Sequence, residues 1–189
     1  MCGRYTLFTD RELKEIDDII QQVGNDANRA RMKTGEICPT DMVPVLTAAK
    51  DRAVPHIFTW GFPSFQGKRV IINARSETIH EKPMFRASVE KRRCVVPSTG
   101  FYEWDPCKKK FLYNMPDSPA LYMAGIYSQF EGENRFVILT TDSNPSIIDV
   151  HERMPVVLTR IQVDEWLFEG NSVDEILCGE HPALIKKAV

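Results

Sequence analysis

The sequence predicts an α+β fold dominated by β-strands, with curled, barrel-like antiparallel sheets and flanking helices. Short runs rich in β-branched and aromatic residues recur between residues 42 and 158, and proline and glycine separate them. Helical periodicity is clear in one segment near the N-terminus. The 189 residues, with 43% hydrophobic content, suffice for one core, so we expect a single domain over residues 1–189.

The first expected element is an amphipathic helix. Thr9 and Glu12 have the spacing of a capping box, and Gly24 ends the pattern. Apolar residues lie between them at helical spacing: Leu13, Ile16, Ile19, Ile20 and Val23. The polar residues 25–36 that follow are expected to form a loop.

Strands are expected to make up most of the remaining chain. Short helices are expected after Asn144-Pro145, after Asp164, and after Ser172 with its capping partner Glu175. The expected strands are Val43 to Thr47, Val54 to Trp60, Arg69 to Asn73, Cys94 to Pro97, Gly100 to Trp104, Lys110 to Asn114, Leu121 to Tyr127, Phe136 to Thr140 and Pro155 to Leu158. No function is assigned to residues 169–189.

Composition excludes several classes of protein. The net charge of -2 gives no overall attraction to nucleic acid or membrane, so any DNA binding must come from a local patch. No apolar run approaches the roughly 20 residues that span a bilayer, and the N-terminus lacks the core of a signal peptide. We therefore expect a monomeric cytoplasmic protein, in the cytosol or nucleoid if the source is a bacterium.

The cysteines and histidines do not form a metal-binding pattern. The five cysteines are scattered and odd in number, and no Cys-x-x-Cys occurs. The four histidines have no ligand spacing with each other or with the cysteines. We expect reduced thiols, no metal and no cofactor.

Cys2 follows the initiator methionine, and a side chain as small as cysteine permits removal of Met1. The chain would then begin with a thiol of pKa about 8.5 beside an α-amine of pKa about 7.7, both partly deprotonated near neutral pH. Such an aminothiol captures an aldehyde as an imine and closes to a thiazolidine. Every chain has some second residue, so this cysteine alone does not establish a catalytic role.

Two further residues suit proton transfer. Glu103 lies among aromatic residues in Gly100-Phe101-Tyr102-Glu103-Trp104, where burial of a carboxylate is costly unless it is hydrogen-bonded or shifted in pKa. His151 lies at an element boundary and titrates near neutrality. A glutamate that faces water and a structural histidine remain the alternatives.

Other residues suit DNA contact. Asn73 and Arg75 close a strand, where an amide can position a sugar oxygen and a guanidinium can hold a phosphate. Basic and aromatic residues also interleave around Trp60, Phe85 and Arg86, as single-stranded DNA binding requires. A polar turn and core aromatics remain the alternatives.

Several multi-residue motifs occur in a fixed order along the chain, and together they resemble the SRAP family, the SOS-response-associated peptidase domain proteins. The resemblance covers about residues 2 to 168. It is carried by Cys2-Gly3-Arg4-Tyr5, Trp60-Gly61-Phe62-Pro63, Asn73-Ala74-Arg75-Ser76-Glu77-Thr78, Phe85-Arg86, Arg93-Cys94-Val95-Val96-Pro97, Gly100-Phe101-Tyr102-Glu103-Trp104 and His151-Glu152-Arg153-Met154-Pro155.

The resemblance implies a SRAP-like fold and a protein that binds abasic sites in single-stranded DNA in DNA repair and the SOS response. Cys2 would form a covalent thiazolidine cross-link with the abasic-site aldehyde and so shield the lesion. Asn73 would orient the opened sugar, Glu103 would assist imine chemistry, and His151 would move protons. The resemblance also implies phosphate contacts by Arg4, Arg75 and Arg153, with Trp60, Phe85 and Arg86 along the DNA path.

Two alternatives stay open at this point. The first is a cysteine peptidase, including self-removal of Met1, in which Cys2, Glu103 and His151 act as nucleophile, orienting group and base. Such an enzyme would attack a peptide even with its amine blocked, whereas aldehyde capture needs the free amine. The second is a single-stranded DNA binder that does not depend on Cys2 and loses affinity as salt rises.

Overall fold

Strands dominate the computed structural model, which describes residues 2–9, 13–64 and 69–189. Five of them form a closed ring in the order β12-β4-β3-β8-β11, because β11 also pairs with β12. All pairs in the ring are antiparallel except β12 with β4. The ring strands are β3 (Met42–Ala49), β4 (Arg52–Trp60), β8 (Arg93–Ser98), β11 (Leu121–Phe130) and β12 (Glu133–Asp142).

Shorter strands extend the ring. A parallel strand, β7 (Asn73–Arg75), and an antiparallel one, β13 (Arg153–Pro155), both pair with β12. On the other side β14 (Val157–Leu158) pairs with β11. In a separate two-stranded sheet, β5 (Phe62–Pro63) pairs antiparallel with β6 (Val70–Ile71).

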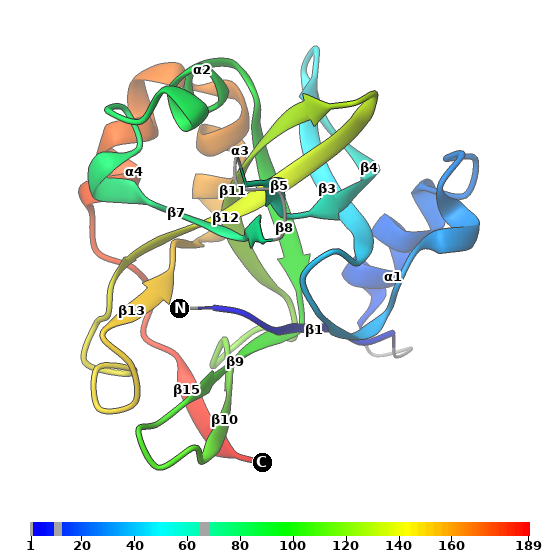
Figure 1. The fold of residues 1–189 in the computed structure, drawn as a ribbon. Coiled ribbons are helices and arrows are strands. Elements are labelled where there is room, and N and C mark those ends of the chain that lie inside the picture. Colours follow the sequence, from blue (N-terminus) through cyan, green and yellow to red (C-terminus); the bar gives the residue numbers. More distant parts are fainter. Residues whose placement is uncertain (1, 10–12, 65–68) are drawn as a thin grey trace.

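A second, five-stranded sheet lies below the ring in Figure 1. Its order is β15-β10-β9-β1-β2, so it contains strands from both ends of the described chain. The strands are β1 (Tyr5–Leu7), β2 (Gly35–Ile37), β9 (Gly100–Trp104), β10 (Lys110–Asn114) and β15 (Ile185–Ala188).

Helices flank the ring on two sides. In Figure 1, α1 (Lys14–Gln22) lies to the right, while α2 (Pro83–Lys91), α3 (Arg160–Phe168) and α4 (Val173–Cys178) lie to the upper left. Single 3-10 turns are η1 (Arg29–Arg31), η2 (Ser76–Thr78) and η3 (Gly170–Ser172). Within the described ranges, no helix combines the length and apolar character needed to cross a membrane.

The core fills the ring and the space under the helices. Trp60 and Phe136 stack from neighbouring strands with ring centroids 6.4 Å apart, and both are fully buried. Trp166 on α3 is also fully buried and donates a hydrogen bond to the Cys94 carbonyl at 2.9 Å. All five cysteines are free thiols.

The predicted fold class is confirmed, and most predicted strands are present. Gly100–Trp104 and Lys110–Asn114 have the predicted bounds, and the other long strands extend one to a few residues beyond them. The run predicted from Arg69 to Asn73 is instead divided between β6 and β7, and the run predicted from Pro155 to Leu158 is divided between β13 and β14. The short strands β1 and β2 and the C-terminal β15 were not predicted.

The helix predictions succeed only in part. The first helix forms but begins at Lys14 with Leu13 as its cap residue, so Thr9 does not cap it, and Glu12 lies outside the described residues. A helix follows Ser172 as predicted, although the Ser172 hydroxyl contacts Glu169 rather than a capping partner. Helix α2, which begins at Pro83, was not predicted.

Two helix predictions are corrected by local hydrogen bonds. The chain after Asn144-Pro145 forms turns, because the Asn144 side-chain oxygen accepts bonds from the Ser146 amide and hydroxyl and competes with helix formation. Helix α3 begins before Asp164, since Thr159 and Gln162 form a complete capping box.

Candidate functional site

Cys2 lies three residues before the start of β1, with its side chain fully buried. Burial raises the pKa of the thiol well above its ordinary value, and the nearby Glu103 carboxylate raises it further. The sulfur lies 3.9 Å from the Arg4 carbonyl oxygen. The thiol is therefore neutral near pH 7 in this form of the chain.

Asn73, the first residue of β7, connects this strand to Cys2. Its Nδ2 atom donates a hydrogen bond to the Cys2 carbonyl oxygen at 2.9 Å. Its Oδ1 atom is buried and, within the described residues, has no hydrogen-bond partner. The amide is thus held at one end and can accept a hydrogen bond from a ligand at the other.

Glu103 is brought to Cys2 by the second sheet. Its strand β9 pairs with β1, where Phe101 lies opposite Tyr5. The side chain is only 3% exposed, and burial raises the pKa of the carboxyl to about 7. At neutral pH such a group exchanges a proton readily, which suits a general acid and base.

His151 lies just before β13 and is half-buried. Its Nδ1 atom lies 2.9 Å from the Arg153 amide nitrogen and 3.2 Å from the Arg153 carbonyl oxygen, so the backbone of Arg153 orients the ring. Burial lowers the pKa of the imidazole below its ordinary value. Strand β12 lies between β13 and β7, so the fold places His151 one strand away from the strand of Asn73.

A hollow of about 330 Å³ adjoins this group. Asn73, Arg75 and Phe85 line it, together with Lys82 and other residues of β6, β7 and the start of α2. The Arg75 and Lys82 side chains are exposed, so two positive charges face solvent beside Asn73. Lys82 was missed by sequence reasoning; its position directly before Pro83, at a helix start, was the available signal.

Trp60 and Arg153, which were predicted to contact DNA, are buried and engaged by other parts of the chain. Trp60 has no exposed surface and donates its indole N–H to the Ile72 carbonyl at 3.0 Å, so no ring face is open to a base. Arg153 is 6% exposed and forms a bidentate ion pair with Glu77 at 2.6 and 2.9 Å, with further bonds to Asp142 and the Thr140 carbonyl. These contacts connect β13 to β12 and to η2.

The remaining predicted contacts lie at the surface or at the edge of the hollow. Arg4 forms an ion pair with Glu36 at 2.7 Å and lies over the Trp104 ring. Arg86 is exposed and pairs with Glu90 at 3.6 Å, whereas Phe85 is buried. Across the residues that the structure describes, no three His, Cys, Asp or Glu side chains are grouped as metal ligands.

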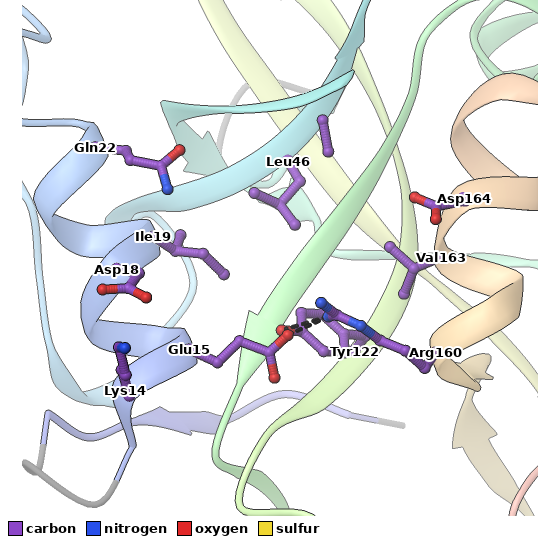
Figure 2. Close-up of a pocket in the computed structure, with 11 residues that line it drawn as sticks. Lys14, Glu15, Asp18, Ile19, Gln22, Leu46, Tyr122, Arg160, Val163 and Asp164 are labelled. Carbon is purple, nitrogen blue, oxygen red and sulfur yellow. Dashed lines mark hydrogen bonds and ion pairs between the residues drawn. The ribbon is translucent and has the colours of Figure 1, made fainter. Parts of the chain in front are cut away.

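A larger hollow of about 570 Å³ lies between α1 and α3 (Figure 2). Glu15 and Arg160 form an ion pair across it, and the Arg160 guanidinium donates a hydrogen bond to the Tyr122 hydroxyl at 3.3 Å. None of the residues predicted for the site is among those that line it. It is therefore separate from the surroundings of Cys2.

A model of the family described as SOS response associated peptidase (SRAP) matches residues 1–183. The chain belongs to the SRAP family. The abasic site processing protein YoqW of Bacillus subtilis is 34% identical over 197 residues, which cover 94% of this chain and 84% of that protein. The abasic site processing protein YedK of Escherichia coli is 26% identical, covering 93% and 85%.

Solved structures support the SRAP fold. A crystal structure of a protein from Bacteroides thetaiotaomicron matches with a TM-score of 0.78 at 24% identity, covering 100% of this chain and 92% of that one. A crystal structure from Bordetella bronchiseptica matches with a TM-score of 0.79 at 21% identity, covering 100% and 99%. The family resemblance inferred from the motifs is confirmed.

Proposed function

We propose that this SRAP protein processes abasic sites in single-stranded DNA by forming a covalent link between Cys2 and the abasic-site aldehyde, which shields the lesion during DNA repair and the SOS response. The observation that carries the proposal is the joining of Cys2, Asn73 and Glu103 beside a hollow edged by Arg75 and Lys82. Relatives that are named abasic site processing proteins support it.

The first chemical step uses the α-amine of Cys2, which is released when Met1 is removed. The amine nitrogen bonds to the aldehyde carbon, and the aldehyde oxygen leaves as water to give an imine. The thiol sulfur then bonds to the imine carbon while the thiol proton ends on the ring nitrogen. Amine, thiol and aldehyde are thus converted to a thiazolidine and one water.

Glu103 would serve both steps because its raised pKa lets it carry a proton near neutral pH. It would donate the proton that the departing oxygen needs and accept the proton of the neutral Cys2 thiol. The free Oδ1 of Asn73 would accept a hydrogen bond from a hydroxyl of the opened sugar. His151, whose imidazole pKa is lowered by burial, would move protons when the link is reversed.

DNA binding would rest on cations around the hollow. Arg75 and Lys82 are exposed there, and Arg86 lies next to Phe85 at the start of α2. Phosphate contacts supply most of the affinity of such a surface. Arg4 would contribute only by exchanging Glu36 for a phosphate.

A peptidase is the second candidate function, and the description of the family model favours it. In this alternative Cys2, Glu103 and His151 act on a peptide bond, including the bond that joins Met1 to Cys2. The high pKa of the Cys2 thiol is unfavourable for such an enzyme, since the thiolate is the nucleophile in acyl transfer.

The deciding experiment is a denaturing gel of protein lacking Met1 mixed with single-stranded DNA that carries one abasic site. We expect a shifted band for the wild type and for the control Cys178→Ala, whose cysteine is exposed and lies after the last of the motifs. We expect no band for Cys2→Ala or for protein that retains Met1. Cys2→Ala should keep most of its DNA affinity, because phosphate contacts remain.

A band from protein with a retained Met1 would show that the amine is not required and would favour the peptidase-type thiol attack. Absence of a band from every form would contradict the proposed function. Loss of DNA binding together with cross-linking in Cys2→Ala would mean that the site had collapsed.

A further inference from the structure

The segment that precedes His151 is a compact turn, residues 144–151, closed on itself. The Ile147 and Ile148 amides donate to the Asn144 carbonyl at 3.0 and 3.1 Å, and the His151 amide donates to the Ile147 carbonyl at 3.1 Å. Ile147 is fully buried, while Asp149 is exposed. The position of His151 therefore depends on where this turn is held.

Residues 181–189, the C-terminal segment, hold the turn along its length. The Asn144 side chain donates to the His181 and Pro182 carbonyls at 3.1 and 3.0 Å. The Ser146 hydroxyl accepts a hydrogen bond from the Leu184 amide at 3.1 Å. Figure 1 shows this segment, in red, running from α4 past β13 to β15.

The last of these contacts joins charged groups. The Lys186 ammonium forms an ion pair with Asp149 and also lies 5.5 Å from the centre of the Phe111 ring. Phe111 is on β10, where it pairs with Ala188 on one side and with Glu103 on the other. The C-terminal segment thus contacts the turn of His151 and, through one intervening strand, the strand of Glu103.

We propose that the C-terminal segment is a positioning strap that sets His151 relative to Glu103, with Lys186 and Asp149 as positioning residues. The proposal rests on the proposed function in so far as His151 and Glu103 serve one reaction. The family model ends at residue 183, so Lys186 lies outside the part of the chain that the family match covers, whereas its partner Asp149 lies inside it. Small displacements of a proton-transfer group reduce rates strongly, which is why such a strap matters.

The test uses protein lacking Met1 with three variants: Lys186→Met, Lys186→Arg and Lys187→Met. Lys187 is the matched control, because it is the next residue on the same exposed strand and β-strand alternation directs it to the opposite face. The single-turnover cross-linking rate is measured at saturating abasic DNA, and affinity is measured with DNA that lacks the abasic site. Thermal unfolding checks that each variant is folded.

We expect Lys186→Met to slow cross-linking about fivefold. An exposed ion pair contributes at most ~1 kcal/mol, which corresponds to a fivefold change in the population of molecules that hold His151 in position. DNA affinity should be unchanged, and Lys186→Arg should keep the wild-type rate because it keeps the charge. Lys187→Met should also match the wild type. Equal rates for Lys186→Met and Lys187→Met, or a slow Lys186→Arg, would overturn the proposal.

Failure of the proposed function itself gives a different result, namely no cross-link from the wild type. The His151 imidazole signals in an NMR spectrum of the DNA-free protein then test the strap alone. Shifted or broadened signals in Lys186→Met but not in Lys187→Met support it. Identical signals in both variants contradict it.

Discussion

At the scale of single residues, burial decides what a functional group can do. The sequence indicated that Glu103, among aromatic residues, would be shifted in pKa if buried, and the structure shows both the burial and the shift. The same principle changes the interpretation of Trp60 and Arg153, because sequence shows which groups are present but not which of them face solvent.

Glu103 should make the stability of the protein depend on pH in an unusual direction. Its pKa rises from 4.5 to about 7 on folding, so between these values the folded chain keeps a proton that the unfolded chain has lost. Stability should therefore fall as pH rises through this window, by up to about 3 kcal/mol. Free energies of unfolding measured with denaturant at pH 5 and pH 8 should show that the stability of Glu103→Gln relative to the wild type is greater at pH 8 than at pH 5.

Glu36→Gln is the matched control with the opposite sign. Lys110 and Arg4 lower the pKa of the Glu36 carboxyl, so its contribution to stability is lost only as pH falls below the unfolded pKa and should stay constant between pH 5 and pH 8. Because this side chain is 38% exposed, the effect should be small. If both variants changed in the same direction with pH, the assignment of the Glu103 shift would be wrong.

At the scale of elements, the corner between β8 and β9 carries the chain from the ring into the second sheet. Thr99 fixes this corner: its hydroxyl donates to the Thr6 hydroxyl at 2.8 Å, and its carbonyl accepts from Asn114. Gly100 has φ of +150°, and a Cβ there would lie 2.5 Å from Asn114 Nδ2 and 2.7 Å from the Tyr113 carbonyl oxygen. The corner therefore sets the position of β9, which places Glu103 near Cys2.

Gly100→Ala should therefore cost about 3 kcal/mol or more, since strain and overlap act together. Gly132→Ala is the control: Gly132 has φ of +85° but nothing within 4 Å of the added Cβ, so strain alone should cost about 1 kcal/mol. Unfolding free energies of the two variants test this. Equal losses of unfolding free energy in the two variants would mean that the neighbours of Gly100 move aside at no cost, which would contradict this prediction.

Elements that are determined by their own residues could be predicted from the sequence, whereas elements that depend on pairing with distant strands could not. The bounds of β9 and β10 followed from their aromatic composition and the turn between them. The strand β15 is four exposed residues long and depends on pairing with β10, which no local pattern encodes. For the same reason the motifs identified Cys2 and Glu103 as candidates, but only the pairing of β1 with β9 shows that they are neighbours.

At the scale of the whole molecule, a net charge of -2 gives no overall attraction to DNA, so under the proposed function binding would rest on the cations around the hollow. Arg75→Gln should make the negative slope of log affinity against log salt less steep by about 0.7, the value for one phosphate contact on single-stranded DNA. Arg153→Gln should leave the slope unchanged and instead reduce stability by about 2 kcal/mol, because its guanidinium is engaged by carboxylates. Binding titrations at several salt concentrations distinguish the two.

The two sheets also differ in their exposure to other chains. Closure leaves the five ring strands without an open edge, whereas the second sheet ends on β2 and β15. The unpaired backbone of an exposed edge strand is a template for aggregation. Lys186 and Lys187 alternate in direction along β15, so an approaching strand would have to bury a charge on either face. The same short strand that pairs with the His151 turn through Lys186 and Asp149 thus also presents charge to any neighbouring molecule that would extend the sheet.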